Sequence, residues 1–212
     1  MSIVQFRCKD CHFSYFVEEY EVEQEEKLHK KFHDEYLNGV KAISQKSDDV
    51  ISEVDGFKVI LVSPNSPSLQ RKRAERIAFR CKINTHYDFA SYHAGDSEQA
   101  DYPLVFIGVI KNRAIGFLVF RQTKKTAKVR WEEYYNRDEE KKIPLSPDKR
   151  WGVSMIWVLE NKRRMGYASK LIEIASNYVS SSISEIAWFT PFSKFGYPLA
   201  KNFSPHEVIL TV

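Results

Sequence analysis

Two pairs of potential metal ligands near the N-terminus constrain the fold of this chain more than any other feature. Cys8 and Cys11 are separated by two residues, and His29 and His33 by three. Two thiolates and two imidazoles complete the tetrahedral shell of a structural zinc site, and histidines four positions apart lie on one face of a helix. A segment of this size has too little core to fold alone. We therefore expect residues 1–45 to form a C2H2-type zinc finger that folds around Zn2+.

The spacing within this finger argues against a DNA-reading role. Seventeen residues separate Cys11 from His29, whereas DNA-reading fingers have about twelve. We therefore expect no sequence-specific DNA binding, and we expect His12 to be a bystander rather than a ligand. The net charge of +4 is a mild basic excess and does not by itself indicate nucleic acid or membrane binding.

The remaining composition is typical of a folded protein from a reducing compartment. The chain has only three cysteines, two of them in the ligand pair, so a disulfide framework is not expected. The polar N-terminus does not have the features of a signal peptide. No run of about 18 apolar residues is present, so we expect no membrane span.

Residues 46–212 alternate strand and helix patterns and are expected to form a second domain of the α/β (α+β) class. Polar residues 44–49 indicate a linker, and helical spacing from Ser66 to about Asn84 predicts a helix. Short apolar runs predict buried strands, the second and third of them paired as a hairpin; these runs are FKVILV at 57–62, residues 104–110, 115–120, 126–131, 152–159, 185–189 and 208–212. The charged, proline-containing stretch 132–150 is typical of a surface loop.

A basic loop between a strand and a helix is the main candidate for an anion site. Arg163-x2-Gly166-x-Ala168 follows the strand at 152–159. Backbone N–H groups at a helix start favour a diphosphate, and Gly166 lets the backbone come close to it. A helix cap with solubilising basic residues would give the same pattern. The order strand, basic loop, helix is the central unit of GNAT acetyltransferases, which bind acetyl-CoA there.

Two further side chains have ordinary interpretations from periodicity. Ala168, Leu171, Ile172 and Ala175 form an apolar stripe on the helix after the loop, and Glu173 points well away from its centre. By this criterion Glu173 is a solvated helix glutamate. Cys81 lies in a helical stripe with Leu69, Arg73 and Ile77, and we expect it in the core rather than as a nucleophile.

Several segments resemble one family closely. They are CKDC and HKKFHDEYLNGV in the finger, FKVILVSPNSP, the hairpin LVFIGVIKNRAIGFLVF, GVSMIWVLENKRRMGYASKLIE and EIAWFTPFSKFGYPLAKNF. Together they resemble the cohesin acetyltransferases, in which a C2H2 finger directly precedes a GNAT domain with a mixed central sheet. The resemblance covers nearly the whole chain. It implies a nuclear, chromatin-associated enzyme that transfers acetyl from acetyl-CoA to lysines of the cohesin Smc ATPase head and so establishes sister-chromatid cohesion.

The resemblance also implies roles for individual residues. The family's zinc ligands fall on Cys8, Cys11, His29 and His33. A catalytic carboxylate falls on Glu173, and a serine near the reacting centre on Ser154. The acetyl-CoA contacts fall on Ile156, Trp157, Val158, Arg164, Met165, Gly166, Tyr167, Ala168, Ser169, Phe192, Ser193 and Lys194. The segment that contains the last three is one residue longer than is usual in the family.

Departures from the family pattern keep alternatives open. The family often has an aspartate where this chain has Thr190, and Thr cannot accept a proton as a carboxylate does. The residues after the second zinc cysteine are His12 and Phe13 in place of the usual Gly-Met. The alternatives are a GNAT enzyme with another amine acceptor, and a catalytically weak zinc-finger protein that binds CoA and a partner.

Overall fold

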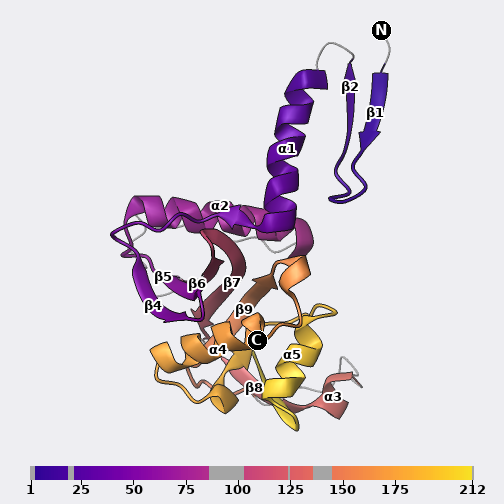
Figure 1. Cartoon of the computed structure of the whole chain (residues 1–212). Helices are drawn as coiled ribbons and strands as arrows, with labels where there is room; N and C mark the ends of the chain where they lie inside the picture. Colours follow the sequence, from indigo (N-terminus) through magenta and orange to yellow (C-terminus); the bar gives the residue numbers. More distant parts are fainter. Residues whose placement is uncertain (1–2, 19–21, 86–102, 124, 136–144, 212) are drawn as a thin grey trace.

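The structure is a computed structural model that describes residues 3–18, 22–85, 103–123, 125–135 and 145–211 (Figure 1). The helices are α1 (Val22–Asn38), α2 (Ser68–Thr85), α3 (Trp131–Tyr135), α4 (Tyr167–Tyr178) and α5 (Gly196–Phe203), with short 3-10 turns η3 (Glu160–Lys162) and η4 (Ile183–Glu185). The strands are β1 (Ile3–Arg7), β2 (Ser14–Glu18), β3 (Val40–Lys41), β4 (Asp49–Val54), β5 (Phe57–Val62), β6 (Leu104–Ile110), β7 (Arg113–Gln122), β8 (Thr126–Arg130), β9 (Trp151–Val158), β10 (Ala187–Trp188) and β11 (Glu207–Thr211).

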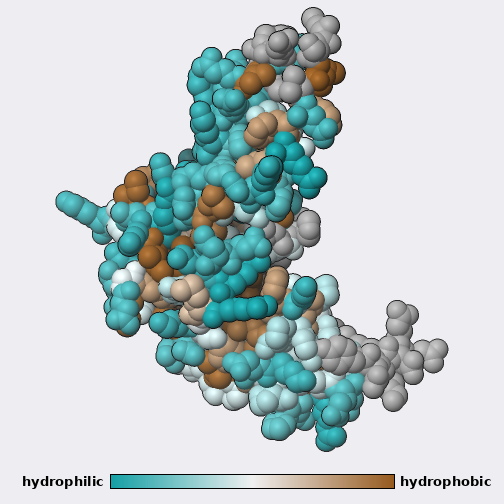
Figure 2. Space-filling model, turned by 45° about the vertical axis from the view of Figure 1, so that its right-hand side comes forward, coloured by the Kyte–Doolittle hydropathy of each residue, from teal (hydrophilic) through white to brown (hydrophobic). Residues whose placement is uncertain are grey.

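The N-terminal part consists of a hairpin and a helix that project from the body of the molecule (Figure 1). β1 and β2 pair antiparallel from Ile3 opposite Glu18 to Arg7 opposite Ser14. α1 runs alongside this hairpin and ends at Asn38, as the Asn38-Gly39 pair predicts. In Figure 2 the same part stands out as a lobe with a largely hydrophilic visible surface. The hairpin was not predicted, because its residues alternate too weakly in hydropathy.

A mixed sheet forms the body of the protein. Its order is β4-β5-β6-β7-β9-β10-β11-β8, and the short β3 pairs with β7. The pairs along β4-β5-β6-β7-β9 are antiparallel, β9-β10 and β10-β11 are parallel, and β11-β8 is antiparallel. The predicted mixed central sheet of an α/β protein is therefore confirmed.

Helices cover both faces of the central strands. Every residue of β7 from Ala114 to Phe120 is buried, which requires cover on both sides because successive side chains point to opposite faces. α2 packs against β5 and β7, and α4 packs against β6, β7 and β9. α4 packs closely against β7 at Gly116, since a Cβ added to this glycine would lie 2.8 Å from Leu171 Cδ1. Among the described helices, none is long and apolar enough to cross a membrane.

Most predicted elements are found, with corrections at their ends. The strands at 57–62 and 104–110 have the predicted bounds, and α4 buries Leu171, Ile172 and Ala175 of the predicted stripe. In α2, Leu69 is exposed, and Gln70 and Ala74 lie on the buried face instead.

The predicted loop 132–150 begins as the end of helix α3, so this prediction was wrong in its first residues. The cause is Trp131, whose indole Nε1 donates to the Ser204 carbonyl at 2.6 Å while its ring packs against Tyr197 at 5.0 Å. Residues 136–144 of that loop, and the connection 86–102 after α2, lie outside the described residues.

The polar segment 44–49, predicted as a linker, is held against α2 by side-chain contacts. Arg73 Nη2 on α2 donates to Asp48 Oδ1 at 2.6 Å, and Asp48 is 1% exposed. Gln70 adds a hydrogen bond to the hydroxyl of Ser47 at 3.1 Å. This segment leads directly into the edge strand β4, which was not predicted because its sequence DVISEV neither alternates strictly nor forms a continuous apolar run.

Candidate active site and metal centre

The four predicted metal ligands lie together between α1 and the turn that joins β1 to β2. One ligand atom from each of Cys8, Cys11, His29 and His33 lies within 4.8 Å of the others. Cys8 Sγ is 3.3 Å from His33 Nδ1, and Cys11 Sγ is 3.4 Å from His29 Nε2. Sulfur and nitrogen ligands of a tetrahedral zinc ion are separated by about 3.5 Å, given the usual bond lengths. The donor set and its spacing therefore fit Zn2+.

The turn that contains the two cysteines favours the thiolate form of Cys8. Hydrogen bonding from the backbone of Cys11, against the opposing effect of burial, lowers the pKa of the Cys8 thiol to about 6. Burial raises the pKa of Cys11 above its ordinary value. His12 has a left-handed backbone, with φ of 57°, and shapes this turn without being one of the clustered ligands. A cation at the centre of the group would stabilise both thiolates.

Aromatic rings pack around the ligands. The rings of Phe6 and Phe13 lie 5.1 and 5.8 Å from His29, and Phe13 lies 4.8 Å from Phe32 on α1. α1 itself has no buried residue. The described finger thus depends on the ligand group and these few ring contacts for its stability.

The sheet opens between β9 and β10. The two strands pair only through Gly152 with Ala187 and Val153 with Trp188, followed by a hydrogen bond from the Phe189 N–H to the Val153 carbonyl at 3.1 Å. β9 continues to Val158 and stays paired with β7 on its other side as far as Gly116. No described strand continues the β10 pairing beyond that point. An extended molecule can enter such an opening and lie against β9.

A bulge in β9 marks the start of the opening. The register against β7 shifts between Met155 and Val153, so that Ser154 is the extra residue. Its hydroxyl donates to the Val119 carbonyl at 3.3 Å. Bulges redirect side chains and occur often beside active sites. This bulge has no local signal in the sequence, because it depends on the pairing of two distant strands.

The loop after β9 presents the start of α4. Arg164 and Gly166 have left-handed backbones, with φ of 62° and 81°, and a Cβ at Gly166 would meet nothing within 4 Å. The first helical hydrogen bond of α4 joins the Lys170 N–H to the Gly166 carbonyl at 3.0 Å, and no side chain caps the helix. The preceding N–H groups thus point out of the helix start, where they favour an anion.

The predicted acetyl-CoA contacts lie on three neighbouring segments. Ile156, Trp157 and Val158 are on β9 beside the opening, and Arg164, Met165, Gly166, Tyr167, Ala168 and Ser169 form the loop and first turn of α4. Phe192, Ser193 and Lys194 precede α5, where the Ser193 hydroxyl accepts from the Gly196 N–H at 2.9 Å. The Arg163 guanidinium lies 5.0 Å from the Phe195 ring and so ties the loop to this third segment. That contact was missed, since nothing local in the sequence indicates it.

Glu173 and Ser154 differ in their surroundings. Glu173 is exposed on α4, as periodicity predicts, while Ser154 is half-buried at the bulge. Thr190 is exposed and lies two residues after the end of β10. The catalytic roles of Glu173 and Ser154 stay predictions.

Comparisons with known proteins support this arrangement. Residues 149–211 match a family model described as ESCO1/2 acetyl-transferase, and this range contains β9, the basic loop, α4, β10, α5 and β11. The chain is 26% identical to N-acetyltransferase ECO1 of Kluyveromyces lactis over 83% of its own length and 78% of that protein. It is 26% identical to human N-acetyltransferase ESCO1 over 79% of its length, but spans only 21% of that protein.

The fold is also similar to a solved structure. The xEco2 acetyltransferase domain bound to a K105-CoA conjugate superposes with a TM-score of 0.61, covering 79% of this chain and 98% of that domain at 21% identity. This likeness concerns the fold, and it confirms the expected GNAT-like architecture.

Proposed function

We propose that this chain is a cohesin acetyltransferase that transfers acetyl from acetyl-CoA to lysines of the cohesin Smc ATPase head, as its similarity to the ECO1 and ESCO1 N-acetyltransferases supports. The observation that carries the proposal is the family match over residues 149–211, which coincides with the open strand pair and the uncapped helix start. The names of the relatives support a role in cohesion, and hence a chromatin-associated substrate and a nuclear location.

Acetyl-CoA is proposed to bind along β9 and the start of α4. Its diphosphate would lie at the N–H groups before Lys170, with Arg164 adding positive charge. Its pantetheine arm would enter the opening beside Ile156, Trp157 and Val158. The CoA conjugate held by the xEco2 domain supports this class of ligand.

Zinc is proposed as a structural ion, held by Cys8, Cys11, His29 and His33. Four protein ligands leave no coordination position open, which is typical of structural and not catalytic sites. The finger is then a folding unit of residues 1–45, followed by the acetyltransferase domain of residues 46–212.

The transfer requires a neutral amine. A free lysine has a pKa of about 10.4, so about one in a thousand or fewer is neutral at pH 7. We propose that the carboxylate of Glu173 takes the proton, directly or through a water. The amine nitrogen then attacks the thioester carbonyl carbon, the C–N bond forms and the C–S bond breaks, and the departing thiolate receives a proton.

Two other groups are proposed to assist this step. Backbone N–H groups of β9 would stabilise the negative oxygen that forms on the carbonyl during attack. The Ser154 hydroxyl, at the bulge, would donate to the departing sulfur. Cys81 is wholly buried and its thiol pKa is raised well above the ordinary value by burial, which favours direct transfer over an acetyl-cysteine intermediate.

Thr190 in the place of the family aspartate is the observation that favours a second candidate, a CoA-binding module without turnover. A mass-spectrometric transfer assay separates the two. Purified protein, acetyl-CoA and a cohesin ATPase-head domain are mixed, with Glu173→Gln as the test variant and Glu185→Gln, another exposed acid, as the matched control.

Acetylation of head lysines by the wild type and by Glu185→Gln, with loss in Glu173→Gln, would support the proposal. Normal transfer by Glu173→Gln would refute the base assignment. Acetyl-CoA binding without transfer to any tested amine would favour the binding module, and acetylation of other amines only would favour another acceptor class.

A further inference from the structure

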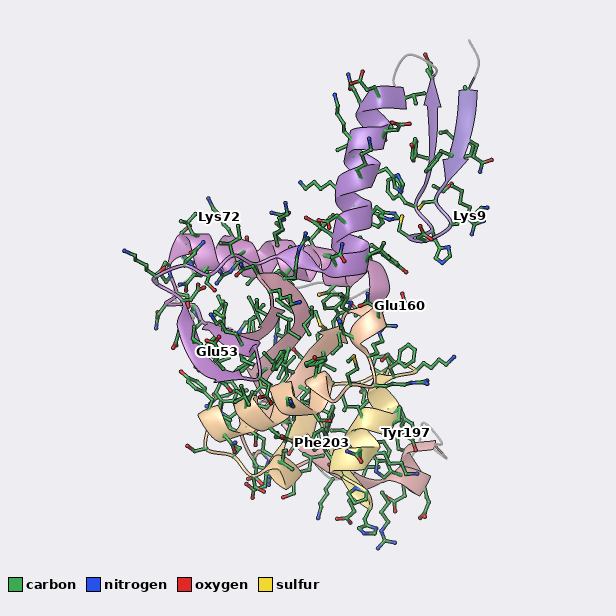
Figure 3. All side chains as sticks on the ribbon, in the orientation of Figure 1. Lys9, Glu53, Lys72, Glu160, Tyr197 and Phe203 are labelled. Atoms are coloured by element: carbon green, nitrogen blue, oxygen red, sulfur yellow. The ribbon has the colours of Figure 1, made fainter. Side chains whose placement is uncertain are left out.

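We propose that the zinc finger positions the loop that binds the CoA diphosphate, so that zinc and acetyl-CoA bind cooperatively. The inference rests on the proposed function, since it takes the loop Glu160–Gly166 as the diphosphate site. It is carried by two hydrogen bonds between the C-terminal end of α1 and the turn that opens this loop. Figure 3 shows Glu160 just below that end of α1.

A single helix joins the metal group to the loop. α1 has 17 residues and carries the ligands His29 and His33. The residues of α1 that contact the body flank the second ligand, beginning with Phe32 and continuing with Asp34. Because an α-helix is continuous and hydrogen-bonded along its length, the position of the ligands fixes the direction in which these residues face.

α1 is seated on the body by charged and cation–π contacts. Arg113 of β7 donates from Nη1 to Asp34 Oδ2 at 2.6 Å and to the Gly39 carbonyl at 3.1 Å. The guanidinium of the buried Arg80 on α2 lies 5.6 Å from the ring of Phe32 and 4.9 Å from that of Tyr36. These contacts place the C-terminal end of α1 next to the turn η3.

Two hydrogen bonds then reach the loop itself. The Tyr36 hydroxyl donates to Glu160 Oε2 at 2.8 Å, and Asn161 Nδ2 donates to the Leu37 carbonyl at 2.8 Å. The second bond satisfies one of the carbonyls that a helix end leaves without an intrahelical partner. Both contacts link residues 124 positions apart in the chain, so neither is imposed by local sequence.

Within the loop, the fixed turn leads directly to the diphosphate site. Arg163 Nη1 lies 3.6 Å from Glu160 Oε1, and Arg163 Nε donates to the Val158 carbonyl at 3.2 Å. The Glu160 carboxylate is thereby held between Tyr36 and Arg163. The next residues, Arg164 and Gly166, adopt left-handed backbones, a conformation that costs free energy for the arginine and needs a fixed neighbour.

In this proposal, zinc stabilises the helix that supplies these contacts. α1 has no buried residue, and an isolated helix of about this length is marginal in water. Loss of zinc would therefore loosen α1 and release Tyr36 and the Leu37 carbonyl from the loop. Acetyl-CoA would then have to order the loop on binding. By thermodynamic linkage, the factor by which zinc tightens acetyl-CoA binding equals the factor by which acetyl-CoA tightens zinc binding.

The test uses the zinc-loaded full chain and the double variant Tyr36→Phe/Asn161→Ala, which removes both hydrogen bonds and no ligand. Glu23→Gln is the matched control, since Glu23 lies on the same helix and forms an exposed ion pair with Lys27 of that helix. Calorimetry gives the Kd for acetyl-CoA, and chelator competition gives the Kd for zinc with and without acetyl-CoA. Circular dichroism checks that each variant is folded.

In the wild type and in Glu23→Gln, saturating acetyl-CoA should tighten zinc binding. In the double variant, the Kd for acetyl-CoA should rise by about three- to thirtyfold, as expected for two exposed hydrogen bonds. In the same variant, acetyl-CoA should hardly change the Kd for zinc, so that the ratio of the zinc Kd values without and with acetyl-CoA approaches one. The KM for acetyl-CoA should rise while kcat at saturation stays near the wild-type value.

A double variant that binds acetyl-CoA as the wild type does, or that keeps the full effect of acetyl-CoA on zinc binding, would overturn the positioning role. If the wild type itself fails to bind acetyl-CoA, the proposed function fails and the inference falls with it. The two failures are thus distinguished by the wild-type titration alone.

Discussion

Replacing Gly39 with alanine tests how closely the finger is seated on the sheet. Gly39 follows α1 with φ of 83°, and its N–H donates to the Glu35 carbonyl at 3.1 Å. A Cβ at this position would overlap the carbonyl oxygen of Ala114 in β7 and lie 3.2 Å from its carbonyl carbon. Because the obstacle is backbone of a fully buried strand, no side-chain rotation can relieve the overlap.

The expected loss of stability has two parts. A left-handed backbone costs a residue with a Cβ about 1–2 kcal/mol, and overpacking against a rigid neighbour adds about 1–3 kcal/mol. Gly39→Ala should therefore lower the free energy of unfolding by about 2–5 kcal/mol.

Gly56→Ala provides the control for the backbone part. Gly56 has a similar φ of 75°, but a Cβ there meets no heavy atom within 4 Å. Gly56→Ala should therefore lower the free energy of unfolding by about 1–2 kcal/mol only. Urea unfolding of both zinc-loaded variants, followed by circular dichroism, gives the difference. If Gly39→Ala costs no more than Gly56→Ala, the close approach of the finger junction to β7 is refuted.

Three further predictions concern other buried or paired groups. Cys81→Ala should leave the acetyl-transfer rate unchanged in the mass-spectrometric assay, whereas loss of transfer by a folded variant would indicate an acetyl-cysteine intermediate. Arg73→Met should lower the free energy of unfolding by about 3–5 kcal/mol, measured in urea, because it leaves the buried Asp48 carboxylate without its partner; the double variant with Asp48→Asn should recover part of this loss, and its failure to do so would argue against the ion pair. Hydrogen bonding from Arg113 lowers the pKa of the Asp34 carboxyl, so the ion pair stabilises the fold above the ordinary carboxyl pKa of about 3.9 and this contribution is lost as the pH falls through the lower folded value. The stability difference between wild type and Asp34→Asn should accordingly shrink below about pH 4, and a difference that is constant with pH would contradict this.

Local patterns identified the elements that carry a strong periodic signal. The run FKVILV became β5 with the same ends, and the apolar spacing after Gly166 became the buried face of α4. The ligand pairs at Cys8–Cys11 and His29–His33 likewise come together as a metal group. In each case the signal lies within short segments of consecutive residues, such as one strand, one helix turn or one ligand pair.

Elements that depend on distant partners were not predicted. β4 is an edge strand that is defined by its pairing with β5, with a register shift between Val50 and Ser52, and the bulge at Ser154 exists only against β7. Trp131 begins a helix because its indole finds the Ser204 carbonyl, 73 positions away. Such features have no local signature, since their stabilising contacts join residues that are far apart in sequence.

The sequence by itself indicated the Cys2His2 group, the α/β class, the strand-loop-helix unit and, through its motifs, the resemblance to the cohesin acetyltransferases. The tertiary structure alone decided where β9 and β10 separate, how Arg163 meets Phe195, and that Tyr36 and Leu37 at the end of the finger helix hold the turn at Glu160 and Asn161. The physical reason is that ligand spacing and hydrophobic periodicity are properties of a few consecutive residues. Contacts between the finger and the loop arise only when the folded sheet brings segments more than 100 residues apart into hydrogen-bonding distance.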